Sequence, residues 1–214
     1  HPHRGIYVLS HTNVARDEIS RRLSASSTGA RLLGYPHYVG TIHAFVNQFL
    51  ALPLLRSDGE AVDVVDNEIF AAQALSLLRT KWTLNAWVRN NPQRGPAAIA
   101  SLRYQGADLT LGYEDGGLPG PGTASWTEAQ QLKDRLRAKG VFRFDDMFAF
   151  AKRLLVRFPD LPKRLSHRFP LVLIDEMQDT SWAQEDLLAR LFDDTVVMQR
   201  YGDRNQRILS SGTD

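Results

Sequence analysis

Short apolar runs near the two ends of the chain predict buried β-strands. Residues 6–9 read Ile-Tyr-Val-Leu, and residues 171–174 read Leu-Val-Leu-Ile. The second run is apolar at every position, which is typical of a strand in a parallel sheet with helices on both faces. Residues 39–41 and 195–198 predict two further short strands. We expect the runs at 6–9, 171–174 and 195–198 to lie in one parallel sheet.

Apolar residues between these runs recur at the spacing of an amphipathic helix. Val14, Ile19 and Leu23 share one face, and Asn13 is the expected N-cap. A similar stripe after the second strand is expected to end at Pro53, because proline breaks an α-helix. Strands that alternate with helices predict an α/β fold with a parallel sheet, whose ligands bind at the carboxyl ends of the strands.

The middle of the chain has a different pattern of predicted secondary structure. Residues 68–82 and 127–139 carry helical patterns, and the surrounding stretch contains few convincing buried strands. We therefore expect residues 46–166 to form a mostly α-helical insertion. The flanking residues 1–45 and 167–214 are expected to form the sheet-containing domain that the insertion interrupts.

Composition narrows the class of protein. With 43% hydrophobic residues, a chain of 214 residues can bury a substantial core. The absence of cysteine excludes disulfides and thiolate metal sites, and the six histidines do not form an H-E-x-x-H zinc motif. The apolar runs are far shorter than the ~20 residues that span a bilayer. We expect a cytoplasmic protein without a membrane partner.

Charge is unevenly distributed along the chain, although the net charge is only +2. Residues 171–214 carry nine acidic and four basic side chains. Such a block is either a solvated surface or a place where carboxylates hold a cation. The charge alone does not separate these two interpretations.

Asp175 and Glu176 follow directly on the strand predicted at residues 171–174, where parallel sheets place ligand-binding groups. One carboxylate could hold Mg²⁺, which takes one or two carboxylates together with phosphate oxygens. The other could accept a proton from an attacking water. An acid pair that stabilises a helix N-terminus is the competing interpretation. The pair by itself leaves both interpretations open.

A longer string around this pair carries a family resemblance. Residues 172–180 read V-L-I-D-E-M-Q-D-T and, with Gln184, resemble the V-D-E-F-Q-D-T-x-x-x-Q element of the Rep/UvrD family of DNA helicases and translocases. Residues 202–206 resemble the next element of that family, G-D-x-x-Q. Upstream segments are similar to three further elements in the family's order: residues 12–22 to T-N-x-A-A-x-E-M-x-x-R, residues 40–45 to G-T-F-H-S-F, and residues 144–155 to D-F-x-D-L-L and its helix.

The resemblance implies a RecA-like domain, with helices on both faces of its parallel sheet, interrupted by the helical insertion. It also implies an enzyme that uses ATP and Mg²⁺ to move from 3′ to 5′ along single-stranded DNA. In the family pattern Asp175 binds Mg²⁺ with ATP, Glu176 activates the hydrolytic water, and Gln206 senses the γ-phosphate. The path of single-stranded DNA is implied at Thr12, Asn13, Thr41 and His43.

Two family elements are missing from these residues. No G-x-x-x-x-G-K-[ST] phosphate loop occurs, and neither does the second motor domain with its arginine. We expect the phosphate loop just upstream of residues 6–10, so the chain is interpreted as a fragment that does not hydrolyse ATP alone. His11 stands where the family often has a base-stacking aromatic residue, and the segment after Gln206 lacks the usual aromatics and arginine. These differences predict a weakened grip on DNA.

Three alternatives stand beside this interpretation. One is a non-enzymatic nucleic-acid-binding or regulatory subunit that keeps the motor fold. Another is a metal-dependent nuclease that uses Asp145, Asp146, Asp175 and Glu176. The third keeps the motor and places it in a recombination nuclease or an anti-phage defence complex, with a nuclease or another protein as partner.

Overall fold

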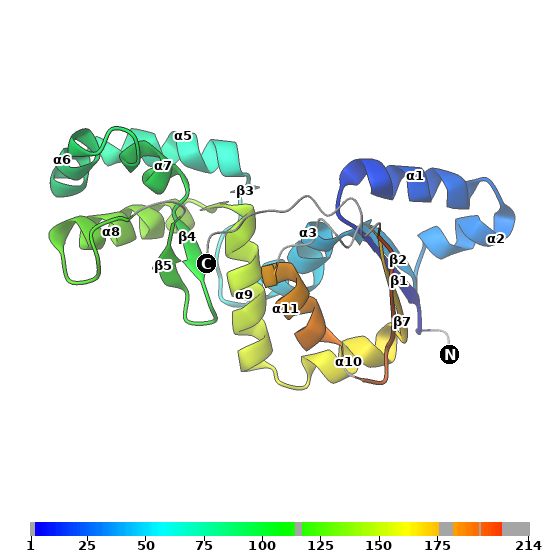
Figure 1. Ribbon diagram of the computed structural model, residues 1–214. Coiled ribbons are helices and arrows are strands. Elements are labelled where there is room, and N and C mark those ends of the chain that lie inside the picture. Colours follow the sequence, from blue (N-terminus) through cyan, green and yellow to red (C-terminus); the bar gives the residue numbers. More distant parts are fainter. Residues whose placement is uncertain (1–2, 114–116, 176–181, 193, 203–214) are drawn as a thin grey trace. The chain divides into compact units, whose positions relative to one another are not determined.

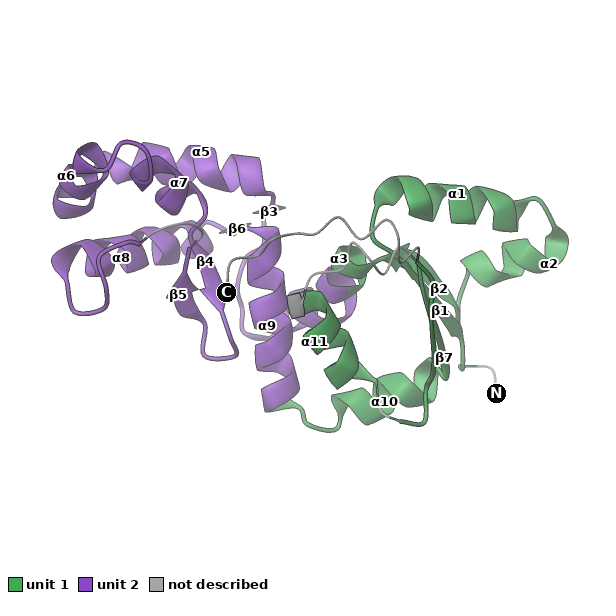
Figure 2. Ribbon diagram, viewed as in Figure 1, with its two compact units in different colours: residues 1–45, 157–214 green, residues 46–156 purple. Residues whose placement is uncertain are grey.

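The computed structural model describes residues 3–113, 117–175, 182–192 and 194–202, with only the backbone at residues 182 and 183. The chain forms two compact units (Figure 2). Unit 1 comprises residues 1–45 and 157–214, and unit 2 comprises residues 46–156. Residues 157–166, which the sequence pattern assigned to the insertion, therefore group with the sheet-containing unit. The interpretation of the units as a motor domain and its insertion stays a prediction.

Unit 1 is built around a four-stranded parallel sheet (Figure 1). Its strands, in the spatial order β2, β1, β7 and β8, are Tyr38–Thr41, Ile6–Ser10, Leu171–Ile174 and Val197–Arg200. Leu9 lies beside Gly40 of one neighbouring strand and Ile174 of the other. The prediction that three of the apolar runs share one parallel sheet is confirmed, with β8 beginning at Val197 instead of residue 195.

Helices cover both faces of this sheet. One face carries α1 (Asn13–Ser24) and α2 (Ser27–Ala30), and the other carries α3 (Ile42–Phe45), α10 (Leu161–Arg168) and α11 (Trp182–Leu191) (Figure 1). The chain moves from β1 to β2 in one direction across the sheet and from β7 to β8 in the opposite direction. Because such crossovers are right-handed, the connecting helices fall on opposite faces. The fold is the expected α/β, RecA-like sheet with helices on both faces.

The two faces of the sheet are buried to different extents. In β1 and β7 full burial alternates with half burial, and Tyr7 and Ile174 lie on the buried face. The ring centroid of Tyr7 is 4.4 Å from that of Phe45 and 5.8 Å from that of Phe192, the residue that follows α11. Helix α1, on the other face, contributes no buried residue. The core of unit 1 therefore lies on the side of α10 and α11, and the α1 side is only partly covered.

A helical run continues from α3 through the π-helix η2 (Val46–Ala51) into α4 (Leu52–Ser57). The expected stop at Pro53 is wrong, because the helix extends to Ser57. Pro53 lies in the first turn of α4, where its missing N–H removes no obligatory hydrogen bond. Proline therefore marks a change of helix type here, and the run does not end.

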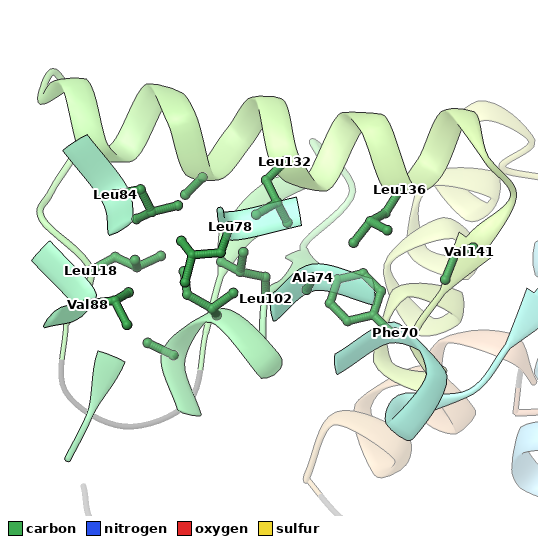
Figure 3. Close-up of a cluster of buried hydrophobic side chains, with 13 residues drawn as sticks. Phe70, Ala74, Leu78, Leu84, Val88, Leu102, Leu118, Leu132, Leu136 and Val141 are labelled. Carbon is green, nitrogen blue, oxygen red and sulfur yellow. The ribbon is translucent and has the colours of Figure 1, made fainter. Parts of the chain in front are cut away.

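Unit 2 is mostly helical and has its own core (Figure 3). After α4 its helices are α5 (Asn67–Leu78), α6 (Trp82–Asn90), α7 (Gly95–Ala100), α8 (Ala124–Ala138) and α9 (Phe144–Arg157). Strands β3 (Val64–Val65) and β6 (Val141–Phe142) pair in parallel, and β4 (Arg103–Gln105) and β5 (Thr110–Gly112) form a hairpin that the sequence pattern did not predict. No helix in the described part of the chain is long and apolar enough to cross a bilayer.

Candidate functional site at the carboxyl edge of the sheet

The parallel register brings most of the expected site residues to one edge of the sheet. Ser10, the last residue of β1, pairs with Thr41, the last residue of β2. On the other side of β1, Leu9 pairs with Ile174, so Asp175 follows β7 at the same edge. The backbone N–H of Asp175 donates to the Leu9 carbonyl at 2.8 Å and fixes this position. Thr12, Asn13 and His43 come directly after the ends of their strands and therefore belong to the same edge.

Thr12 begins α1 as its N-cap. Its Oγ1 accepts a hydrogen bond from the backbone N–H of Ala15 at 3.2 Å, and its backbone is extended. The expectation that Asn13 is the cap is wrong, since Asn13 is the first residue of the helix. The buried Ser10 hydroxyl donates to the Thr12 carbonyl at 3.0 Å and holds the turn between strand and helix. The start of α1 is thereby fixed at the edge of the sheet.

Thr41 plays the same part for the second segment. Its Oγ1 accepts from the backbone N–H of Ala44 at 3.1 Å, and the residue is nearly buried. His43 lies half-buried in the short helix α3 that follows. A threonine hydroxyl that accepts one hydrogen bond still has its own hydrogen to donate, so both threonines could donate to a phosphate oxygen.

The start of α1 has a favourable electrostatic character for anions. The first turn of the helix carries no acidic side chain, so its unpaired N–H groups and its dipole are not neutralised there. Further along the helix, Glu18 lies 2.7 Å from both Arg21 and Arg22. Hydrogen bonds from these two guanidinium groups lower the pKa of Glu18 to about 2. Glu18 therefore stays ionised, and its charge is offset by two cations.

An open pocket of about 540 Å³ joins this helix to the acid at the end of β7. Its lining combines apolar side chains of α1 with charged groups: Thr12, Val14, Ala15, Glu18, Ile19, Arg22 and Asp175. Val14 is 80% exposed, although the sequence pattern placed it on the apolar face of an amphipathic helix. The pocket is large enough for a small polar ligand, and the half-buried Asp175 is one of its lining residues.

Asp175 is suited to hold a divalent cation only together with a ligand that brings its own oxygens. The described residues contain no group of three acidic or histidine side chains that could form a metal site by themselves. Mg²⁺ commonly takes one or two carboxylates and completes its shell with phosphate oxygens and water. The lone carboxylate of Asp175 fits that donor set. Glu176 and Gln206, the other two expected nucleotide-site residues, lie outside the described residues.

Asp146 has a structural part in unit 2. Lys133 Nζ lies 2.6 Å from Asp146 Oδ2, and the two side chains are 1% and 0% exposed. The Asp146 carboxylate also accepts from the backbone N–H groups of Tyr104 and Arg143, at 2.7 and 2.8 Å. Burial lowers the pKa of Lys133 to about 8, although Asp146 acts in the opposite direction. Both carboxylate oxygens are committed to the fold, so the alternative of a nuclease with Asp146 as metal ligand is wrong.

Tyr201 is an edge residue to which the sequence analysis gave no role. It follows β8, its N–H donates to the Ile174 carbonyl at 2.7 Å, and the residue is 54% exposed. Its hydroxyl donates to Gln199 Oε1 at 2.8 Å. The signal was available, because an aromatic residue directly after a predicted strand lies at the ligand-binding edge.

Comparison with known proteins places this geometry in a family. Residues 1–210 match the family described as UvrD/REP helicase N-terminal domain. The ATP-dependent DNA helicase PcrA of Leuconostoc citreum is 26% identical over 208 residues, which are 95% of this chain and 27% of that protein. An ATP-dependent helicase/nuclease subunit of Streptococcus sanguinis (strain SK36) is 38% identical over 65 residues, 29% of this chain and 5% of that protein.

The chain thus spans about a quarter of the length of the PcrA relative. The family match runs through both units and includes the edge segments described above. The parallel sheet with helices on both faces agrees with it. This chain belongs to the UvrD/REP helicase family, whose N-terminal domain it matches over nearly its whole length.

Proposed function

We propose that this domain is part of a cytoplasmic, ATP-dependent DNA helicase or translocase that hydrolyses ATP with Mg²⁺ and moves from 3′ to 5′ along single-stranded DNA. One observation carries the proposal: a single sheet edge gathers Asp175 with the segments Thr12–Asn13 and Thr41–His43. A nucleotide and a DNA strand bound at one edge would both contact the same parallel sheet. A structural change at the nucleotide could therefore be transmitted through the sheet to the DNA strand.

The acidic residues after β7 supply the chemistry of hydrolysis. Asp175 would hold Mg²⁺, which when bound offsets the negative charge of the phosphates. Glu176 would accept the proton of the attacking water, and Gln206 would contact the γ-phosphate. The half-burial of Asp175 in the lining of the open pocket supports the first of these roles. The roles of Glu176 and Gln206 rest on the family resemblance alone.

The outer side of β8 offers a place for the phosphate-binding element. In the described part of the chain β8 pairs with β7 alone, and three of its four residues are exposed. A parallel strand that paired there would end at the same edge as Asp175, where a phosphate loop is needed.

The threonines and the start of α1 support binding of a DNA backbone. The hydroxyls of Thr12 and Thr41 could each donate to a phosphate oxygen, and the first N–H groups of α1 point to the same edge. Contacts of this kind position a strand and do not read its sequence. The proposed binding of single-stranded DNA is therefore independent of sequence.

The test uses the full-length protein and measures phosphate release from ATP with and without oligo(dT). We expect oligo(dT) to stimulate ATP hydrolysis by the parent protein. The Asp175→Asn variant should lose ATP hydrolysis and keep the thermal unfolding midpoint of the parent. The matched control is Asp160→Asn, an exposed acid of unit 1 whose side chain caps no helix; it should hydrolyse ATP like the parent. A parent protein that binds oligo(dT) but never releases phosphate would contradict the proposal and support a non-enzymatic role.

A nuclease partner or domain in the complete protein is a second proposal. It is supported by the 65-residue similarity to a protein named as part of a helicase/nuclease. The test is to incubate the full-length protein with labelled duplex DNA, Mg²⁺ and ATP. Unwound but intact strands would contradict coupling to a nuclease within the chain, whereas ATP-dependent shortening of the strands is the expected result.

A further inference from the structure

A stretch of unit 2 that includes α6 and α7 contains no acidic residue. Glu68 and Asp108 are consecutive acids in the sequence, and the residues between them include five basic side chains: Arg79, Lys81, Arg89, Arg94 and Arg103. Arg79, Arg89 and Arg94 are exposed. In a chain whose overall net charge is +2, this is a local concentration of positive charge on a described surface.

Trp82, the first residue of α6, is 86% exposed in the middle of this basic stretch. It is the only exposed large apolar side chain between residues 79 and 107, all of which the structure describes. Trp87, one and a half turns further along, packs partly buried against the core of unit 2. The exposure of Trp82 is therefore not a general property of tryptophans in this helix.

Helical spacing places a cation on the same face as this indole. Trp82, Ala86 and Arg89 stand at positions i, i+4 and i+7 of α6, and all three are exposed. A rise of ~1.5 Å per residue separates the Cα atoms of Trp82 and Arg89 by about 10 Å along the axis. The small side chain of Ala86 leaves the space between them open.

The opposite face of α6 is anchored to the core of unit 2. Leu84 and Val88 are buried in the core of unit 2, and the backbone N–H of Leu84 donates to Glu128 Oε2 at 2.7 Å. Lys81 Nζ lies 2.8 Å from Gln131 Oε1 on α8. Glu128 is thus an acid near the start of α6, and its carboxylate is already engaged by the helix N-terminus. The backbone that carries Trp82 is therefore fixed to the core of unit 2.

We propose that the exposed face of α6 that carries Trp82 and Arg89, within the acid-free stretch that also includes the exposed Arg79 and Arg94, is a second binding site for single-stranded nucleic acid. An unstacked base would lie on the indole of Trp82, and the arginines would contact phosphates. The pairing of an aromatic platform with a basic track suits a strand of any sequence. A protein partner would need an apolar patch of several hundred Å², whereas this face offers one indole among polar and basic side chains. The site goes beyond the sheet edge of unit 1 and does not require ATP hydrolysis.

The test measures binding of a fluorescein-labelled oligo(dT) of about 20 nucleotides to the 214-residue chain by anisotropy, at about 50 and 200 mM salt. Trp82→Ala should bind about 5- to 150-fold more weakly, and Trp82→Phe should recover part of the loss, because a smaller ring still stacks. Arg89→Gln should reduce the slope of log affinity against log salt by about 0.7. Quenching of tryptophan fluorescence by the oligonucleotide should fall in Trp82→Phe.

Matched controls come from α9 of the same unit. Val156→Ala removes another exposed apolar side chain, and Arg153→Gln removes another exposed cation; both should bind like the parent.

Thr41→Ala and His43→Ala report on the sheet edge independently. If Thr41→Ala weakens binding and Trp82→Ala does not, the α6 site is overturned while the proposed function stands. If only the Trp82 and Arg89 variants weaken binding, the α6 site stands without the edge. Parent-like binding by both α6 variants, as expected for a surface that contacts an acidic protein instead, also overturns it.

Discussion

The sequence contains two similar pairs of consecutive acidic residues, Asp145–Asp146 in unit 2 and Asp175–Glu176 in unit 1. Asp146 is fully buried, pairs with Lys133 and accepts two backbone N–H groups. Asp175 is half-buried in the wall of an open pocket, and no ion pair joins it to another described side chain. The comparison teaches that an acid pair indicates ligand chemistry only where the backbone leaves its oxygens free.

The largest expected effect comes from the pair that follows β7. In the full-length protein, Glu176→Gln should lower ATP hydrolysis by ~10² to 10⁴-fold, the contribution of a positioned general base. Binding of ATP and the unfolding midpoint should stay close to those of the parent. Phosphate-release kinetics and nucleotide titration separate the two quantities. Loss of ATP binding in a folded variant would make Glu176 a ligand and not the base.

The buried pair should respond in stability. Asp146→Ala leaves the Lys133 ammonium without its counter-ion in the core, which should lower the free energy of unfolding by ~3–5 kcal/mol. Urea unfolding followed by tryptophan fluorescence reports mainly on unit 2, because three of the four tryptophans, Trp82, Trp87 and Trp126, lie there. The neighbouring Asp145→Asn is the control, since the Asp145 side chain is 45% exposed. Equal losses of unfolding free energy in both variants would contradict a special structural role of Asp146.

The pH dependence of stability should carry the signature of Lys133. Burial lowers its pKa from 10.5 to about 8, while Asp146, Arg143 and Asp145 are the charged groups that also act on it. Between these two values the unfolded chain binds more protons, so the unfolding free energy of the parent should rise with pH from about 8 to 10.5. Urea midpoints of the parent and Lys133→Met, measured across this range, should show the rise in the parent alone. A parallel pH course in both proteins would assign it to other groups.

The smallest effect concerns Glu18 at the rim of the pocket. Hydrogen bonds from Arg21 and Arg22 lower its pKa to about 2, so its contribution to stability is present above the ordinary value of 4.5 and is lost as pH falls towards 2. The Glu18 side chain is 41% exposed, so Glu18→Gln should shift the acid-unfolding midpoint only slightly, and high salt should remove the shift. A large shift that survives high salt would mean that Glu18 supports the pocket in another way.

The sequence was informative wherever burial follows from local pattern. Apolar runs located the strands, and their alternation with helices predicted the parallel sheet and its carboxyl edge, to which Thr12, Thr41 and Asp175 belong. The helix beyond Pro53 was missed because proline is tolerated in a first turn, and the sequence does not show where that turn begins. The roles of Glu176 and Gln206 stay predictions.

The burial of Asp146 depends on a residue in another helix, and that dependence is hard to read from one segment. A signal did exist on α8, where Ala129, Leu132, Lys133 and Leu136 share the buried face. A lysine within an apolar stripe needs a buried partner of opposite charge. The sequence does not name that partner, because several acids lie within reach of any such lysine.

The open side of β8 has a practical consequence for handling the chain. Its outer backbone N–H and C=O groups have no strand partner in the described part of the molecule, and Val197 on the same strand is 58% exposed. Such an edge is a template onto which a second chain can add a strand. Self-association that grows with concentration is therefore expected for the isolated 214-residue chain. An apparent size above that of a monomer would then reflect pairing at the edge of β8 and not a biological oligomer.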